Sequence, residues 1–188
     1  HPLDIEGLRV FAPDRCVVEA ASFATSEQAL VLLDSFLHRK LGEHAHLSRR
    51  FERMRSWPKV RHLHIPIAMA DGKADGPGEF RGRWLFRTAG LPAPTLQFEV
   101  RREDGTLAGV SDWAWKQEGL LGEFDGRVKY GRLLKPGESA GDAVFREKRR
   151  EDELRELTTW PMFRLIWSDY DRPVATIERV QRLMHRAA

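Results

Sequence analysis

Hydrophobic residues at helical spacing dominate the first third of the chain. The clearest helix begins at Thr25, which with Gln28 fits a capping box, and closes at Gly42, a residue type favoured just after a last turn. Further helices are expected over residues 13–23 and 43–57. The leucines that form the buried face of the central helix are Leu30, Leu33, Leu37 and Leu41.

The apolar pattern changes period after residue 79. A helix is expected over 79–89, and from there short alternating runs separated by turns predict strands. The elements expected after this helix are strands 95–100, 107–115 and 120–125, helix 143–157, strand 162–167 and a last helix from Pro173. The order is α-β-β-β-α-β-α, which predicts an α/β fold preceded by a small helical region.

Small and polar residues, including three glycines and a proline, gather between positions 71 and 78. Such a composition is typical of a linker. We therefore place a domain boundary there. Residues 1–70 are expected to form a helical basic region, 71–78 the linker, and 79–188 a second domain.

The composition is that of a globular protein without membrane spans. The 188 residues are 41% hydrophobic and 31% charged, and no segment approaches the roughly 18 apolar residues that a span requires. Cys16 is the single cysteine, which excludes an intrachain disulfide and suits a reducing compartment. We expect a cytoplasmic protein that does not engage a membrane.

Positive charge is concentrated between Arg39 and Arg61. This stretch holds eight lysines and arginines against two glutamates, so its local charge of +6 exceeds the +3 of the whole chain. Contact with nucleic-acid phosphates is one interpretation and a solvated helix face is the other, and the pattern favours them equally. The candidate DNA-binding residues are Arg49, Arg50, Arg53, Arg55 and Lys59.

Acidic residues gather near the ends of the predicted strands. Glu123 and Asp125 are two apart, so their side chains leave one face of a strand, and Asp112 in the preceding strand adds a third carboxylate. Clustered carboxylates need a compensating cation, and Mg²⁺ (or Mn²⁺) would polarise a phosphodiester. Ordinary turn or strand positions explain the three acids equally well. Glu79 could be a fourth ligand, although a helix N-terminus and pairing with Arg83 explain it better.

Two expectations concern packing. Helix 143–157 balances five basic residues against five acidic ones, and we expect Lys148 and Asp152 to face the carboxylates while the rest is solvated. Three tryptophans are expected in the core rather than as base-stacking groups. These are Trp113, Trp115 and Trp167.

The element order, with an acid on the first helix, an aspartate on the second strand and an acid pair on the third, resembles the PD-(D/E)XK nuclease fold. Four segments are similar to a family of actinobacterial proteins. In these, an endonuclease-like domain, similar to very-short-patch repair endonucleases, ends a chain that often begins with a helix-turn-helix of the abortive-infection antitoxin type. The resemblance is strong over about residues 76–188 and weaker over 3–70. The segments that carry it are Leu91–Gln97, Ser111–Trp115, Gly122–Tyr130 and Phe145–Asp152.

The resemblance implies a metal-dependent endonuclease that hydrolyses DNA phosphodiesters with Mg²⁺ or Mn²⁺. The lysine that the motif places two residues after Glu123 is Asp125 here, so Lys129 or Lys148 would have to supply the ammonium. The residues assigned to the site are Glu79, Asp112, Glu123, Asp125, Lys129 and Lys148. Of these, the expected metal ligands are Glu79, Asp112 and Glu123.

Two alternatives to the enzyme stay open. One is a DNA-binding regulator or antitoxin of a type IV toxin–antitoxin system that kept the nuclease fold and lost turnover. The other is a protein-interaction scaffold that touches no nucleic acid. The resemblance also implies partners besides DNA. These are a cognate toxin, a second copy of the chain and the family's helix-turn-helix module, which has no counterpart in this sequence.

Overall fold

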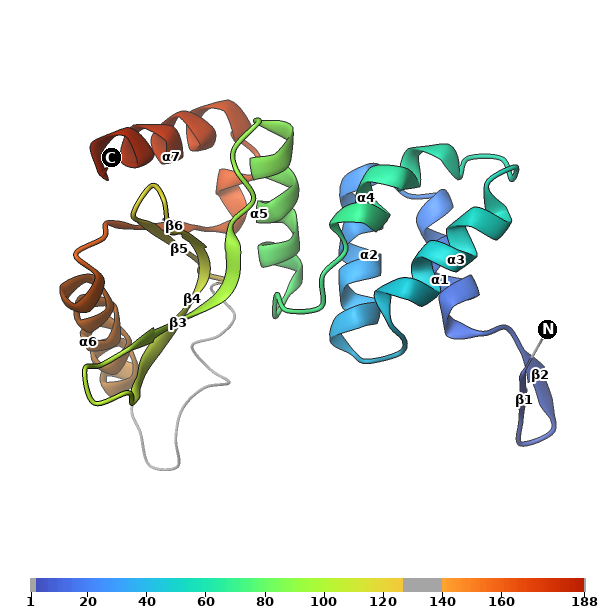
Figure 1. Ribbon diagram of the computed structural model, residues 1–188, viewed down its shortest axis with the longest axis horizontal. Helices are drawn as coiled ribbons and strands as arrows, with labels where there is room; N and C mark the ends of the chain where they lie inside the picture. Colours follow the sequence, from blue (N-terminus) through green and yellow to red (C-terminus); the bar gives the residue numbers. More distant parts are fainter. Residues whose placement is uncertain (1–2, 127–139, 188) are drawn as a thin grey trace. The chain divides into compact units, whose positions relative to one another are not determined.

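The protein has a mixed α/β architecture divided between two compact units (Figure 1). The computed structural model describes residues 3–126 and 140–187. The units are His1–Trp84 and Leu85–Ala188, and the division falls inside helix α5 (Pro77–Thr88). Within the described residues, no helix combines the length and the apolar character that crossing a bilayer demands.

The first unit opens with a β-hairpin that the hydrophobic pattern did not predict. Its strands pair antiparallel, and the turn between them places Glu6 and Gly7 at φ of 51° and 79°. Positive φ at both central positions is what a tight two-residue hairpin turn requires. The elements of this unit before α5 are β1 (Leu3–Ile5), β2 (Leu8–Val10), α1 (Pro13–Ser22), α2 (Ser26–His38), α3 (His44–Met54), a 3-10 turn (Arg61–Leu63) and α4 (His64–Met69).

The predicted capping box at the start of α2 is confirmed. The N–H of Gln28 donates to the hydroxyl oxygen of Thr25, and the N–H of Thr25 donates to the side-chain oxygen of Gln28. The helix ends at His38, however, and the prediction that Leu41 lies on its buried face is wrong, because Leu41 is 54% exposed. Lys40 takes a left-handed φ of 55°, which turns the chain before Leu41 is reached.

A buried ion pair crosses the helical core of the first unit. Asp34 of α2 is fully buried, and Arg83 of α5 donates both to its Oδ2 and to the carbonyl oxygen of Met69. The N–H of Asp71 donates to Oδ1 at 2.7 Å. Burial raises the pKa of Asp34 to about 6, although the charge of Arg83 opposes the rise. The apolar core around this pair includes Val18, Leu33, Leu47, Leu63 and Ile67.

The segment predicted as a linker, residues 71–78, lies against α2. The Nδ1 of His38 is 3.3 Å from the carbonyl oxygen of Gly72, and its Nε2 is 3.5 Å from Oδ1 of Asp75. A Cβ on Gly72 would stand 2.8 Å from the backbone carbon of Leu37. Glycine at this position therefore permits a close approach of two backbones.

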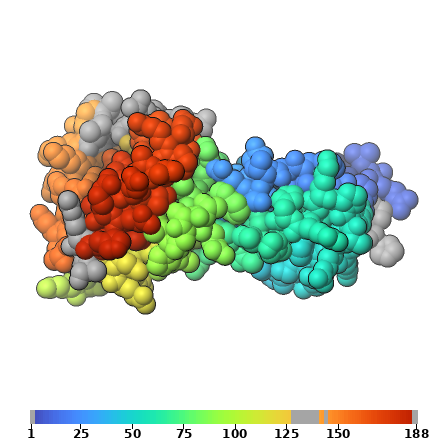
Figure 2. Space-filling model, turned by 90° about the horizontal axis from the view of Figure 1, so that it is seen from above, coloured from blue at the N-terminus to red at the C-terminus, as the bar shows by residue number. Residues whose placement is uncertain are grey.

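The second unit is a four-stranded mixed sheet with helices on both faces (Figure 1). The strands follow the order β3-β4-β5-β6, in which β6 is parallel to β5 and the other neighbours are antiparallel. Helix α6 covers one face, α7 and the end of α5 cover the other, and α7 forms the outer surface there (Figure 2). The elements after α5 are β3 (Thr95–Arg101), β4 (Leu107–Trp115), β5 (Leu120–Phe124), α6 (Ala140–Thr158), β6 (Met162–Leu165) and α7 (Pro173–Ala187).

Aromatic residues build the core on the α7 face of the sheet. Phe86 of α5 meets the rings of Trp113 and Trp115 edge-on, with centroids 5.1 and 4.9 Å apart. Both tryptophans are buried, which confirms the prediction for them. The same prediction is wrong for Trp167, which is 42% exposed because β6 ends at Leu165 and Trp167 begins a 3-10 turn.

The raised pKa of Asp34 predicts how the stability of the first unit depends on pH. The folded pKa is about 6 against a usual 3.8, so the contribution of Asp34 is complete below about pH 4 and is lost as pH rises through 6. We expect wild type to gain up to about 3 kcal/mol relative to Asp34→Asn between pH 7 and pH 4. Native-state hydrogen exchange of the α2 amides measures this difference.

Asp14→Asn is the matched control for Asp34→Asn. Burial opposes the ionisation of Asp14, but the hydrogen bond and charge of Arg50 outweigh it and lower its pKa. Asp14 therefore stabilises the unit at neutral pH and loses this contribution as pH falls. The two variants should show opposite trends, and a wild-type advantage over Asp34→Asn that is the same at pH 7 and pH 4 would contradict the assignment.

Candidate functional site

One polar side chain from each of the four strands stands on a single line across the sheet. Glu123 of β5 lies opposite Arg164 of β6. The antiparallel registers, continued by one residue, place Asp112 of β4 opposite Glu123, and Gln97 of β3 opposite Asp112. Asp112, Glu123 and Arg164 are on the face that α6 covers, because residues two positions away belong to the core beneath that helix. We call these four residues the polar row.

Glu123 is held between two arginines. Arg150 of α6 donates to its Oε1 at 2.5 Å, and Arg164 donates to its Oε2 at 3.1 Å. The side chain of Glu123 is only 8% exposed, and a carboxylate removed from water needs such partners to stay ionised. The carboxylate expected to hold a metal is thus neutralised by the protein itself.

The two arginines also bind carboxylates of α6. Arg150 contacts Glu147 at two points, 2.5 and 3.2 Å, and Arg164 donates to Glu151 at 2.9 Å. Burial disfavours the charge of Arg150, but Glu147 and Glu123 outweigh it, so its pKa is raised. Burial likewise opposes the ionisation of Glu147, but the hydrogen bond and charge of Arg150 lower its pKa overall. Arg150 and Glu147 are therefore both ionised at neutral pH.

Two uncharged groups donate hydrogen bonds to Asp112. The N–H of Phe124 donates to its Oδ2 at 2.7 Å, and the amide nitrogen of Gln97 donates to Oδ1 at 3.4 Å. Gln97 takes a left-handed φ of 48°, which is unfavourable for a residue with a side chain. As a result, Leu96 and Phe98 pack into the cores on opposite faces of the sheet. Local strain of this kind often accompanies a functional site.

The polar row does not fit the predicted Mg²⁺ site. Guanidinium groups engage both carboxylate oxygens of Glu123, so a divalent ion would have to displace Arg150 and Arg164. Across residues 3–126 and 140–187, no three Asp, Glu, His or Cys side chains are grouped so that they could hold a metal ion. The guanidinium groups beside Glu123 are themselves bound by further carboxylates, Glu147 for Arg150 and Glu151 for Arg164.

The remaining acids of the predicted site lie in different places. Glu79 belongs to the first unit, where it is buried and accepts a hydrogen bond from the N–H of Asp75 at 2.9 Å. Asp125 follows β5, and its Oδ2 lies 3.8 Å from a guanidinium nitrogen of Arg164. Lys129 falls outside the described residues. Asp112, Glu123 and Asp125 are thus the predicted site residues that the second unit brings together.

The cation of α6 that reaches the sheet is Arg150 rather than the predicted Lys148. The prediction that Lys148 and Asp152 face the carboxylates is wrong, because both are exposed. Leu154 is fully buried against the sheet, and Arg150, one turn before it, reaches Glu123. The position of Leu154 was the one signal in the sequence from which Arg150 could have been found. Nothing comparable pointed to Arg164 or Gln97.

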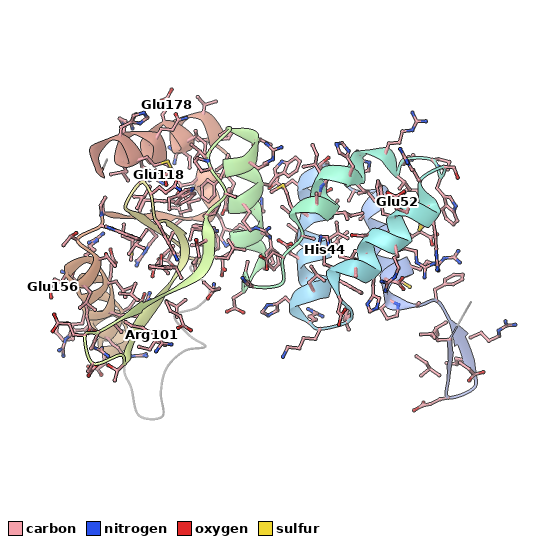
Figure 3. All side chains as sticks on the ribbon, viewed as in Figure 1. His44, Glu52, Arg101, Glu118, Glu156 and Glu178 are labelled. Atoms are coloured by element: carbon pink, nitrogen blue, oxygen red, sulfur yellow. The ribbon has the colours of Figure 1, made fainter. Side chains whose placement is uncertain are left out.

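The predicted DNA-binding residues are not equivalent. Arg50 turns to Asp14 of α1, at 2.9 Å between nitrogen and oxygen. Arg55 lies 3.9 Å from Glu52, which is labelled in Figure 3. That second pair is largely exposed on both sides and leaves its arginine open to solvent. The exposed cations of the predicted set are Arg49, Arg53, Arg55 and Lys59.

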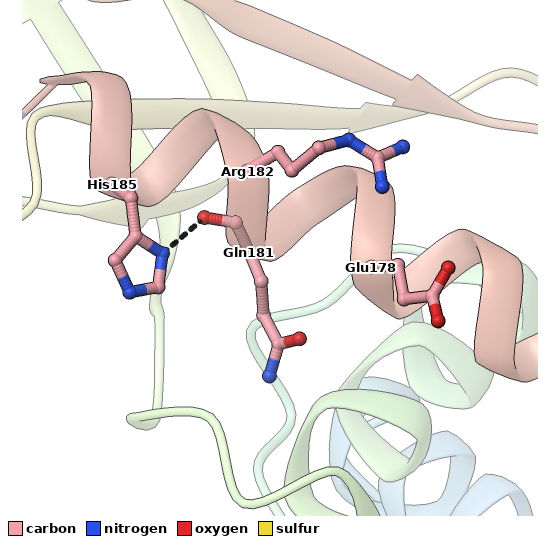
Figure 4. Close-up of a pocket in the computed structure, with 4 residues that line it drawn as sticks. All are labelled: Glu178, Gln181, Arg182 and His185. Atoms are coloured by element: carbon pink, nitrogen blue, oxygen red, sulfur yellow. Dashed lines mark hydrogen bonds between the residues drawn. The ribbon is translucent and has the colours of Figure 1, made fainter.

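A hollow of about 440 Å³ lies beside α7 (Figure 4). Within it, the Nδ1 of His185 donates to the carbonyl oxygen of Gln181 at 2.7 Å, an ordinary contact between successive helix turns. Helices α6 and α7 cover opposite faces of the sheet, so this hollow and the polar row are separate features. The residues that line the hollow are Glu178, Gln181, Arg182 and His185.

The arginine network predicts that Arg150 stabilises the second unit. Replacing it in Arg150→Met leaves Glu123 with one guanidinium partner, and we expect the unit to lose about 2 kcal/mol of unfolding free energy. Arg149→Met, which removes an exposed cation from the same helix, should change stability by less than about 0.5 kcal/mol. Urea unfolding followed by tryptophan fluorescence compares the two. Equal losses would show that the network contributes nothing beyond surface charge.

Comparison with known proteins assigns no family to this chain. No family model matches the sequence, and neither the curated proteins nor the solved structures include a significant match. The polar row and the exposed cations of the first unit therefore have to be interpreted from their own geometry.

Proposed function

We propose that this protein is a DNA-binding regulator whose second unit has a nuclease-like order of elements but does not cleave DNA. The observation that carries the proposal is the pairing of Glu123 with Arg150 and Arg164. A metal-dependent nuclease needs its motif carboxylate open to a cation from solution. In this chain, Arg150 and Arg164 occupy the position beside Glu123 that the cation would take.

The order of elements supports the nuclease-like part of the proposal. The succession α5-β3-β4-β5-α6-β6-α7 is the order on which the resemblance to PD-(D/E)XK nucleases rests. Asp112 and Glu123 lie on the second and third strands, where the motif has its acids. The motif lysine is replaced by Asp125, and a carboxylate there repels the charge that a lysine would stabilise in phosphodiester cleavage.

The exposed cations of the first unit support the DNA-binding part. Arg49 and Arg53 stand one turn apart on α3 and are both exposed, so one phosphate backbone can meet both. Lys59 adds an exposed charge beyond the helix. The chain also resembles antitoxin-type proteins. A regulator of that type would bind DNA without cleaving it.

A metal-dependent endonuclease using Mg²⁺ or Mn²⁺ is the second candidate function. It is favoured by the register of β4 and β5, which places Asp112 opposite Glu123 on one face of the sheet. That placement is what a shared cation would need, although both side chains are engaged by other donors. Hydrolysis would require those donors to be displaced when substrate binds.

The proposal predicts that duplex DNA binding depends on the cations of α3. We expect Arg49→Ala/Arg53→Ala to weaken binding of a labelled duplex and to reduce the slope of log affinity against log salt by about 2, one for each lost phosphate contact. Fluorescence anisotropy over a series of salt concentrations measures both quantities.

Arg172→Ala/Arg182→Ala is the matched control for this experiment. It removes two exposed charges from the second unit, so it changes the net charge equally. We expect the control to leave the salt slope unchanged. If wild type binds no duplex at low salt, or if the two double variants weaken binding alike, the first unit is not the DNA-binding surface and the proposal fails.

A cleavage assay separates the two candidate functions. We expect no nicking of supercoiled plasmid by wild type in Mg²⁺ or Mn²⁺, because arginines hold Glu123. Agarose gels of plasmid incubated with wild type, Asp112→Asn, Glu123→Gln and the control Arg149→Ala give the result. Nicking by wild type and by the control that both acid variants lose would establish the endonuclease and overturn the regulator.

A further inference from the structure

Three exposed aromatic rings border helix α1 in the first unit. Phe11 precedes the helix, Phe23 follows it, and Trp57 lies in the segment after α3. Their exposed fractions are 51%, 74% and 42%. Exposed aromatic rings are a common feature of binding surfaces, because they stay in contact with water until a partner covers them.

A cation lies over each of the three rings. The guanidinium carbon of Arg15 is 3.9 Å from the centroid of Phe11 and 5.6 Å from that of Trp57. The ammonium of Lys59 is 5.2 Å from the centroid of Phe23. At these distances the ring face attracts the cation. The contacts orient the rings while the rings keep exposed surface, and we call these five residues the aromatic–cation face.

The aromatic–cation face is continuous with the basic stretch of the chain. Helices α1 and α3 pack against each other (Figure 1), and the Arg50–Asp14 ion pair joins them at 2.9 Å. Arg55 and Lys59 flank Trp57 in sequence, and both are exposed. Trp57 therefore lies within the most positively charged stretch of the chain, and Phe11 and Phe23 flank the helix that packs against it. A neutral apolar partner would have to strip water from these cations without compensation.

We propose that the aromatic–cation face binds single-stranded DNA, with the rings stacking on unpaired bases and the cations contacting phosphates. Planar bases joined by anionic phosphates match a surface of rings and cations in both chemistry and order. In a duplex the bases stack on one another, so an intact duplex uses only the cations. The inference rests on the proposed DNA binding and adds the strand state of the DNA.

The experiment compares single-stranded and duplex DNA on the full chain. Labelled oligothymidylate and a labelled duplex of equal length are titrated with wild type and with Phe23→Ala/Trp57→Ala, and anisotropy is recorded. We expect the double variant to lose about tenfold or more of its affinity for oligothymidylate, because stacking contributes substantially for each base. Its affinity for the duplex should fall less than twofold.

Two further variants show whether stacking is responsible. Phe145→Ala removes a ring whose exposure, 64%, lies between those of Trp57 and Phe23, from α6 in the second unit, and should change neither affinity. Trp57→Phe keeps a stacking ring and should retain most of the affinity that Trp57→Ala loses. Urea midpoints of all variants report whether the first unit stays folded.

Each remaining outcome decides the proposal. An unchanged affinity of Phe23→Ala/Trp57→Ala for oligothymidylate, with duplex binding intact in wild type, overturns the inference and leaves the proposed function standing. Absence of binding to either DNA at low salt overturns both. Vesicles with anionic headgroups are titrated in parallel, and if the double variant loses vesicle binding but not DNA binding, the face serves a membrane surface and the inference is wrong.

Discussion

An ionised carboxylate removed from water needs a cation or hydrogen-bond donors beside it, and in each unit of this protein arginine meets that need for one buried acid. In the first unit Asp34 is fully buried and meets Arg83 of α5. In the second, Glu123 is nearly buried and meets Arg150 and Arg164. In each case the cation comes from an element distant in sequence, so the pair forms only when helices and strands are already in place.

The pairing of Glu123 distinguishes its carboxylate from an open metal ligand. A carboxylate with two guanidinium partners contributes to stability, and it no longer presents the uncompensated charge that attracts a divalent ion. In the first unit, Arg49, Arg53 and Lys59 remain exposed. Both units neutralise a buried acid within the fold, by Arg83 in the first and by Arg150 and Arg164 in the second.

Local sequence features were predicted well. The capping box of Thr25 and Gln28, the burial of Trp113 and Trp115 and the order of strands and helices after residue 79 depend on residues close in sequence. Predictions failed where one residue changed the path of the chain. Lys40, at positive φ, ended α2 before Leu41. The short hairpin β1–β2 was missed because three-residue strands carry too few alternations to form a pattern.

The sequence by itself determined the order of elements after residue 79 and the acids on β4 and β5, because periodicity and turn residues act over a few positions. Only the tertiary structure decided the chemistry of the site. Arg164 lies 41 residues from Glu123 and meets it through the parallel pairing of β5 and β6. Arg150 rather than Lys148 reaches the same carboxylate because Leu154 sets the rotation of α6 on the sheet. Which side chain reaches Glu123 depends on packing across the sheet. The spacing of residues along the chain carries no information about that packing.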